Sequence, residues 1–179
     1  MTDADPKPSP IPDHVLTIVI EAPVEAVWNE ITKTGRLQRP LMNTVLESDL
    51  QPGHKLRYYS PDKKRVFVVG EVLEVTPPHR FQHTYVFTTE YEPPTVVTWE
   101  LEEVPEGCKV TLTHGGWSEA HKAPHKSRAG WQQILETLKA EVETGDIPFK
   151  TKLMYAVMGR MMFILPKSTK VEEVERAGW

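Results

Sequence analysis

The feature that most constrains this chain is one long amphipathic helix near its C-terminal end, predicted to span about Pro124 to Glu143. Its large apolar residues recur at helical spacing, which places them on one face: Trp131, Ile134, Leu135, Leu138 and Val142. Pro124 suits a helix start and Gly145 suits a helix end. Such a helix must cover a sheet with its apolar face, and we expect any function to lie in the space between helix and sheet.

Six segments before this helix have the composition of strands and are separated by short turn sequences rich in proline, glycine and aspartate. They are residues 44–50, 54–60, 65–75, 80–88, 95–103 and 109–114. Close spacing and turn residues predict an antiparallel meander, with Gly70 as the expected position of a bulge.

The N-terminal part adds one further strand and one short helix. The alternating, β-branched segment from Val15 predicts the strand, and Pro23 opens a helix that carries Val24, Val27, Trp28 and Ile31 on one side and ends at Gly35. The following RLQRPLM reads as a weaker helical turn that Pro40 interrupts. The sequence therefore predicts an α+β domain, in which a curved antiparallel sheet wraps around the long C-terminal helix.

The composition limits the number of domains and the classes of partner. A chain of 179 residues that is 39% hydrophobic can bury one core, and a net charge of −4 argues against non-specific nucleic-acid binding. Residues 1–13 read as a disordered lead-in with no secretory signal. Cys108 is the single cysteine, expected in a turn as a partly exposed and inert thiol. These features favour a cytoplasmic protein.

Strand alternation predicts which side chains face the long helix. The inward set is aromatic and apolar with a few polar tips, which is typical of a small-molecule site. The predicted ligand-binding residues are Tyr58, His83, Tyr85, Trp99, His114, Trp131 and Leu135. The alternative is a filled core that binds nothing, and for the aliphatic residues the core interpretation is favoured.

Catalysis and metal binding receive less support. His83 and Tyr85 share a face and could act as acid or base, yet no acidic residue on the same strand orients His83, and the sequence has no nucleophile elbow or phosphate loop. His114, His121 and His125 are irregularly spaced, and no cysteine or carboxylate stands beside them at ligand spacing. We expect no catalytic residue, no metal and no cofactor.

A family resemblance rests on three pieces of sequence: GEVLEV-PP-R, the TLTH element, and GW-QIL-LK-E-ETG. From Val15 to Gly145 the chain resembles the Aha1-like (activator of Hsp90 ATPase homologue 1-like) group of the START/Bet v1-like (SRPBCC) superfamily. The resemblance implies a helix-grip fold with a hydrophobic cavity under the C-terminal helix. It also implies lipid or polyketide-like ligands, enzymatic action in a few members, and service to the chaperone Hsp90 in eukaryotic relatives. LQRPLMNT departs from the family because a tryptophan-rich segment often stands there.

Residues 147–179 form a C-terminal extension beyond the predicted helix-grip domain of residues 14–146. Its segment Leu153–Leu165 is apolar except for Gly159 and Arg160, and is too short to span a bilayer. We expect an extra helix with one buried stripe: Met154, Met158, Met161 and Leu165. Three roles are open: a lid on its own domain, an interface with a second copy or another protein, or a helix lying on an anionic membrane. The sequence favours the first two over the third.

The predicted function is binding of an apolar, lipid- or polyketide-like molecule in the cavity, as a non-catalytic carrier or sensor. The alternative is a protein-interaction module, such as an Hsp90 co-chaperone-like partner in a stress response. A weaker alternative is a cyclase- or hydrolase-like enzyme acting on a hydrophobic substrate.

Overall fold

Eight strands form one antiparallel sheet in a computed structural model that describes residues 11–122 and 126–179. The strands are β1 His14–Ile20, β2 Leu37–Gln38, β3 Thr44–Glu47, β4 Lys55–Tyr59, β5 Val66–Thr76, β6 Arg80–Phe87, β7 Thr95–Val104 and β8 Gly107–Gly115. Their order across the sheet is β1-β8-β7-β6-β5-β4-β3-β2, so every consecutive pair from β2 to β8 is a neighbour. The predicted meander is confirmed.

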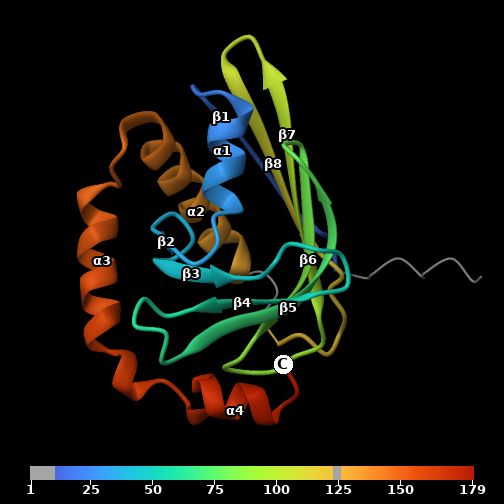
Figure 1. Ribbon diagram of the computed structural model, residues 1–179, viewed down its shortest axis with the longest axis vertical. Helices are drawn as coiled ribbons and strands as arrows, with labels where there is room; N and C mark the ends of the chain where they lie inside the picture. The colour runs from blue at the N-terminus through green and yellow to red at the C-terminus, as the bar shows by residue number, and fades with distance from the viewer. Residues whose placement is uncertain (1–10, 123–125) are drawn as a thin grey trace, which may run out of the picture.

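The first two helices lie against the concave side of this sheet, the third along the margin of the molecule, and the fourth against the outer face of β5 and β6 (Figure 1). They are α1 Val24–Ile31, α2 Lys126–Thr144, α3 Phe149–Arg160 and α4 Val171–Arg176, with short 3-10 turns η1 Met162–Ile164 and η2 Lys167–Thr169. The curved sheet around α2 confirms the predicted helix-grip architecture. None of the helices in the described part of the chain is long and apolar enough to cross a bilayer.

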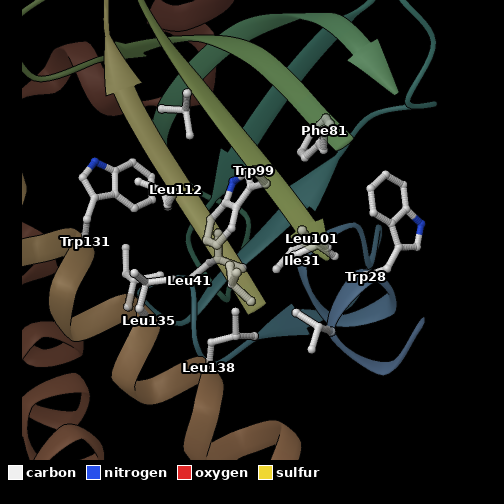
Figure 2. Close-up of a cluster of buried hydrophobic side chains, with 14 of the residues drawn as sticks. Trp28, Ile31, Leu41, Phe81, Trp99, Leu101, Leu112, Trp131, Leu135 and Leu138 are labelled. Carbon is white, nitrogen blue, oxygen red and sulfur yellow. The ribbon is translucent and has the colours of Figure 1, made fainter. Parts of the chain in front are cut away.

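The core confirms the apolar face of the long helix. Figure 2 shows Trp131, Leu135 and Leu138 of α2 pointing toward Trp99 and Leu112 of the sheet. All five side chains are buried, and Leu138 and Leu112 are completely so. Burial of each such side chain stabilises the fold by about 1.5–3 kcal/mol. The helix ends at Thr144, and Gly145 follows it with φ +74°, which fits the stop predicted at this glycine. The predicted start at Pro124 lies outside the described residues.

Gly70 lies where β5 and β6 approach each other closely, and it is not the position of the predicted bulge. An added Cβ there would lie 2.0 Å from the main-chain oxygen of Thr84 on β6. The register between β5 and β6 shifts two residues further on, between Val72 and Glu74. A side chain at Gly70 is therefore excluded by the neighbouring strand.

Two local expectations were wrong. The segment RLQRPLM contains strand β2, in which Leu37 and Gln38 pair with β3, and Gln38 turns its side chain back to donate to the last carbonyls of α1 (2.9 Å to Glu30). Pairing along an edge gives this backbone partners that a helix interrupted by proline would lack. Cys108 is completely buried in β8, because the turn ends at Gly107, whose φ is +133°.

The C-terminal extension also differs from its predicted form. The helix runs from Phe149 to Arg160 and is followed by η1, and its buried residues are Thr151 and Tyr155. Of the predicted methionine stripe, Met158 is 41% and Met161 is 48% exposed. The Tyr155 hydroxyl donates to the main-chain oxygen of Arg39 at 2.8 Å, and this bond fixes which side of α3 faces the domain.

Candidate functional site

An apolar cavity of about 450 Å³ lies between α2, the inner face of β4–β6 and the segment from Met158 to Leu165. This volume falls in the range of about 300–1,000 Å³ that small-molecule sites occupy. The cavity is lined by Leu41, Met42, Thr44, Tyr58, Phe67, Val68, Tyr85, Phe87, Thr89, Trp131, Ile134, Met158, Met161, Met162, Ile164 and Leu165. None of these lining residues is charged, so the space suits an uncharged molecule.

Two tyrosines give the cavity its polar end. Tyr58 on β4 and Tyr85 on β6 both line it, and neither hydroxyl forms a hydrogen bond within the described residues. Burial raises the pKa of both phenols, and the nearby Tyr58 raises the pKa of Tyr85 further. Both groups therefore stay protonated at neutral pH and can donate a hydrogen bond to a ligand oxygen.

His83 lies deeper, with ring centroids 6.1 Å from both Tyr58 and Tyr85. Its Nδ1 lies 2.8 Å from the main-chain oxygen of Thr84, which requires that Nδ1 carry the proton. Nε2 is then an acceptor, and it is buried without a hydrogen-bond partner. Burial lowers the pKa of His83 to about 4, so the ring is neutral at physiological pH.

Both ring nitrogens of His114 form hydrogen bonds, and these bonds belong to a chain from Trp131 to the main chain of β6. The Trp131 indole donates to its Nδ1 at 2.7 Å, so its Nε2 donates to the Thr95 hydroxyl at 2.8 Å. Thr95 in turn donates to the main-chain oxygen of Tyr85 at 3.0 Å. Burial, followed by the neighbouring histidines, lowers the pKa of His114 to about 3. This neutral histidine ties α2 to the sheet and holds Trp131 in place.

The seven predicted ligand-binding residues fall into two groups. Tyr58, Tyr85 and Trp131 line the cavity. The other four are buried in the protein next to it: His83, Trp99, His114 and Leu135. Trp99 packs edge-on to Trp131 at 6.0 Å between ring centroids, and so supports the cavity wall from behind.

Sequence reasoning missed the lining residues of the first loop, of β5 and of the C-terminal extension. Leu41 and Met42 come from the segment read as a helical turn, and Phe67 from a strand whose inner face was not assigned. The apolar run Leu153–Leu165 was the available signal for Met158, Met161 and Leu165, because a run too apolar for water has to cover something.

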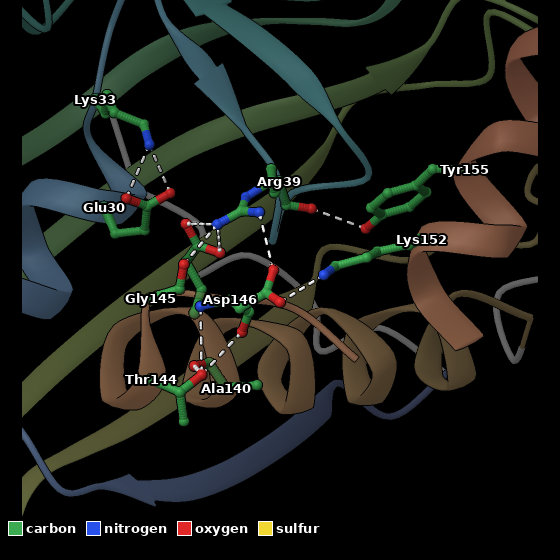
Figure 3. A network of polar contacts seen from close by, with 10 residues as sticks. Glu30, Lys33, Arg39, Ala140, Thr144, Gly145, Asp146, Lys152 and Tyr155 are labelled. Carbon is green, nitrogen blue, oxygen red and sulfur yellow. Dashed lines mark hydrogen bonds and ion pairs between the residues drawn. The ribbon is translucent and has the colours of Figure 1, made fainter. Parts of the chain in front are cut away.

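The extension is held to the domain at both sides of the cavity mouth. Figure 3 shows the first attachment, in which Arg39 pairs with Asp146 (3.2 Å) and Lys152 of α3 also binds Asp146. Arg39 pairs in addition with Glu141 of α2 at 2.7 Å. At the second, the Arg65 side chain donates to the Thr169 hydroxyl at 2.6 Å, and the main chain of Arg65 forms an isolated antiparallel β-bridge with that of Lys170.

The C-terminal helix α4 is attached to the sheet by apolar contacts in addition to those of Arg65 with the preceding segment. Val174 of α4 packs with Val66, Val69 and Val86 on the outer face of the sheet. Residues 158–165 therefore cross the mouth between two fixed points.

The histidines of the described chain do not assemble the metal site that the sequence raised as a possibility. No three His, Cys, Asp or Glu side chains within residues 11–122 and 126–179 are grouped to hold a metal ion, and His125 lies outside these ranges. Both nitrogens of His121 are committed, to Ser118 and to the main-chain oxygen of Pro93. The polar groups at the cavity are hydroxyls that can orient a ligand oxygen.

Comparison with known proteins agrees with this architecture. The family model for activator of Hsp90 ATPase homolog 1-like proteins matches residues 21–143, which is more than half of the chain. No curated protein sequence matches the chain.

Solved structures of diverse proteins share the fold. A protein of the dynemicin biosynthetic locus, DynU16, has a TM-score of 0.64 at 22% identity, covering 77% of this chain and 49% of its own. The Aha1 dimer from Colwellia psychrerythraea has 0.62 at 17%, covering 76% and 99%. PFC0360w, an HSP90 activator from Plasmodium falciparum, has 0.58 at 24%, covering 76% and 97%. The TM-scores show a common fold, and at identities below 25% the likeness shows the fold alone.

Proposed function

This chain belongs to the activator of Hsp90 ATPase homolog 1-like family, and within that family we propose that it is a non-catalytic carrier or sensor of an apolar small molecule. The observation that carries the proposal is the cavity of about 450 Å³, whose lining has no charged side chain. An empty apolar space of this size forgoes many van der Waals contacts, which a bound molecule would supply.

The lining also defines the class of ligand. A carboxylate or an ammonium group would find no opposite charge among the lining residues, and burying it unpaired is costly. A hydroxyl or carbonyl oxygen, in contrast, could accept hydrogen bonds from Tyr58 and Tyr85. We therefore propose an uncharged, lipid- or polyketide-like ligand with an oxygen at the end that reaches the two tyrosines.

The experiment is titration with Nile red, a neutral apolar dye, followed by competition. Ile134→Trp fills the cavity from α2, so the dye's Kd should rise at least about tenfold, equivalent to about 1.4 kcal/mol. Gln132→Trp is the matched control, because Gln132 is exposed on the same helix. Equal affinities in the two variants would contradict binding in this cavity.

Competition tests the predicted polarity of the ligand. The neutral 1-dodecanol should displace the dye better than dodecanoate. Tyr85→Phe should weaken dodecanol binding by about two- to tenfold, the value of one neutral hydrogen bond. Tyr59→Phe is the control, because Tyr59 packs on the opposite side of the sheet with the Val174 cluster. Native mass spectrometry of protein from its own host would identify the natural ligand.

The second candidate is a protein-interaction module acting on Hsp90. The family description and the activator from Plasmodium falciparum favour it. An Hsp90 ATPase assay with the purified protein tests it directly, and stimulation that persists in Ile134→Trp would separate this role from ligand binding.

Two further proposals come from the sequence. An enzymatic role on a hydrophobic substrate is the weaker alternative, because the lining residues include no pair of nucleophile and base. We also propose a cytoplasmic location, which the single buried thiol of Cys108 supports, since it offers no disulfide.

A further inference from the structure

The outward side of α3 is apolar, which is unusual for a helix on the surface of a domain. Thr151 and Tyr155 face the domain and are buried. On the opposite side, at four-residue spacing, Phe149 is 78% exposed, Leu153 56% and Val157 47%. In Figure 1, α3 forms the outer margin of the molecule, away from the long strands of the sheet.

This face belongs to a wider concentration of exposed apolar side chains. Among the described residues, seven of the twelve large exposed hydrophobic side chains fall between positions 149 and 164. They are Phe149, Leu153, Val157, Met158, Met161, Phe163 and Ile164, called the α3 patch below. Contiguous apolar surface of this kind marks a site of interaction.

Within residues 147–171, which carry the α3 patch, the charges have a single sign. Carboxylates lie beside its Phe163 end, where Asp62, Glu172 and Glu175 share a surface hollow with lysine and arginine side chains. Residues 147–171 contain five Lys or Arg side chains and no Asp or Glu. Lys152 is committed to Asp146, whereas Lys150, Arg160 and Lys167 are exposed and form no ion pair within the described residues. Arg160 lies at the end of the outward side of α3, and Lys150 and Lys167 flank the patch in the sequence.

We propose that the α3 patch docks the protein on the surface of an anionic lipid bilayer. An exposed helix face of Phe, Leu and Val bordered by Lys and Arg is the composition of helices that lie in a membrane interface. Anionic lipids complement the unpaired cations, and the aliphatic and aromatic side chains enter the headgroup region.

The charges disfavour two other occupants. In a twofold dimer centred on Leu153 and Val157 of α3, Lys150 and Arg160 of both copies would bring positive charge to the same contact. Protein interfaces are depleted in lysine, whereas this patch is bordered by lysines. The exposure of the patch gives the extension an outward surface in addition to the segment that lines the cavity, whereas the sequence led us to expect a buried methionine stripe.

The position of the patch links docking to the cavity. Met158, Met161 and Ile164 are exposed and also line the cavity mouth, so a docked protein would hold this mouth at the bilayer surface. An uncharged apolar ligand could then pass between bilayer and cavity without crossing water. This link rests on the proposed function, whereas docking itself does not.

The test is co-sedimentation of the full-length protein with vesicles of phosphatidylcholine alone and of phosphatidylcholine with phosphatidylglycerol. We expect binding to the anionic vesicles, weakened in high salt because the cations are screened. Leu153→Glu should lower the partition coefficient by at least about tenfold, since it removes an apolar anchor and adds a repelled charge. Val15→Glu is the matched control, because Val15 is 51% exposed on β1, outside the patch.

Several results would overturn docking. They are no binding to anionic vesicles, equal binding of the two variants, or a dimer in solution that Leu153→Glu converts to monomer, which would assign the patch to a second copy. Loss of Hsp90 stimulation in Leu153→Glu without vesicle binding by the unchanged protein would assign it to a protein partner. Circular dichroism is the check that both variants fold. Nile red binding by the unchanged protein in the absence of vesicles reports on the cavity separately, so each proposal can fail without the other.

Discussion

Acidification should destabilise this protein through two buried histidines. The perturbation is a change from pH 7 to pH 5. Burial holds the native pKa of His83 at about 4 and that of His114 at about 3, against about 6.5 in an unfolded chain. As the pH falls below 6.5 the unfolded chain takes up protons that the native protein does not, so stability is complete above about pH 6.5 and is lost progressively toward pH 4 for His83 and pH 3 for His114.

The magnitude follows from the interval between these values. At pH 5 each histidine is about 1.5 pH units below its unfolded pKa and still neutral when native, which costs about 2 kcal/mol. The two together should lower the free energy of unfolding by about 4 kcal/mol. That is a large part of the 5–15 kcal/mol typical of a folded domain.

Urea unfolding at both pH values, followed by tryptophan fluorescence, gives this difference by linear extrapolation. In His83→Asn the difference should shrink by about 2 kcal/mol, because the amide keeps a donor for Thr84 but does not titrate. If the unchanged protein loses less than about 1 kcal/mol, or if His83→Asn loses as much as the unchanged protein, the histidines are not the cause.

Three further substitutions test the packing around the cavity. Gly70→Ala should lower the free energy of unfolding by about 1–3 kcal/mol or more, because its Cβ would meet the backbone of Thr84 at 2.0 Å; an unchanged urea midpoint would contradict this. Trp131→Phe leaves the buried Nδ1 of His114 without its donor and should cost about 1–3 kcal/mol by the same assay, whereas a loss below about 0.5 kcal/mol would refute the role given to the bond. Tyr155→Phe removes the hydrogen bond that orients α3 and should speed amide exchange in residues 149–160 while leaving exchange in β7 and β8 unchanged; equal exchange everywhere would show that α3 is held by other contacts.

Much of the fold could be predicted because its signals are local and periodic. The spacing of Trp131, Ile134, Leu135 and Leu138 identified both the helix and its buried face, and turn residues separated the strands of the meander. Cys108 was wrongly assigned to a turn because β8 begins one residue earlier, at Gly107, and sequence patterns do not locate a strand start to within one residue. Leu37 and Gln38 were misassigned because a two-residue edge strand depends on its partner β3, not on its own pattern.

The site was less predictable, because the sequence pattern shows which side chains point inward but not where they leave space unfilled. Strand alternation placed Tyr58, Tyr85 and Trp131 on the inner side, yet it could not separate them from Trp99 and Leu135, which the same alternation and helix spacing bury in the core. The segment Leu153–Leu165 could be singled out from the sequence by its apolar composition. Its orientation depends on contacts of α3 with other parts of the chain, such as the bond from Tyr155 to the main-chain oxygen of Arg39 and the ion pair of Lys152 with Asp146, which no periodic pattern reveals.

The place of β1 in the sheet has a consequence for biosynthesis. Among the described strands, His14–Ile20 pairs with β8 alone, along a register from His14 opposite His114 to Ile20 opposite Cys108. At translation rates of about 5–20 residues per second, the first strand is made roughly 5–20 s before its partner. During that interval HVLTIVI is an apolar, β-branched segment without a ladder, the kind of segment that associates with other nascent chains. The β2–β8 meander can assemble by adding neighbours in order, whereas the edge that β1 completes must wait for the last hairpin, so the slow step of folding should be the docking of β1 on β8.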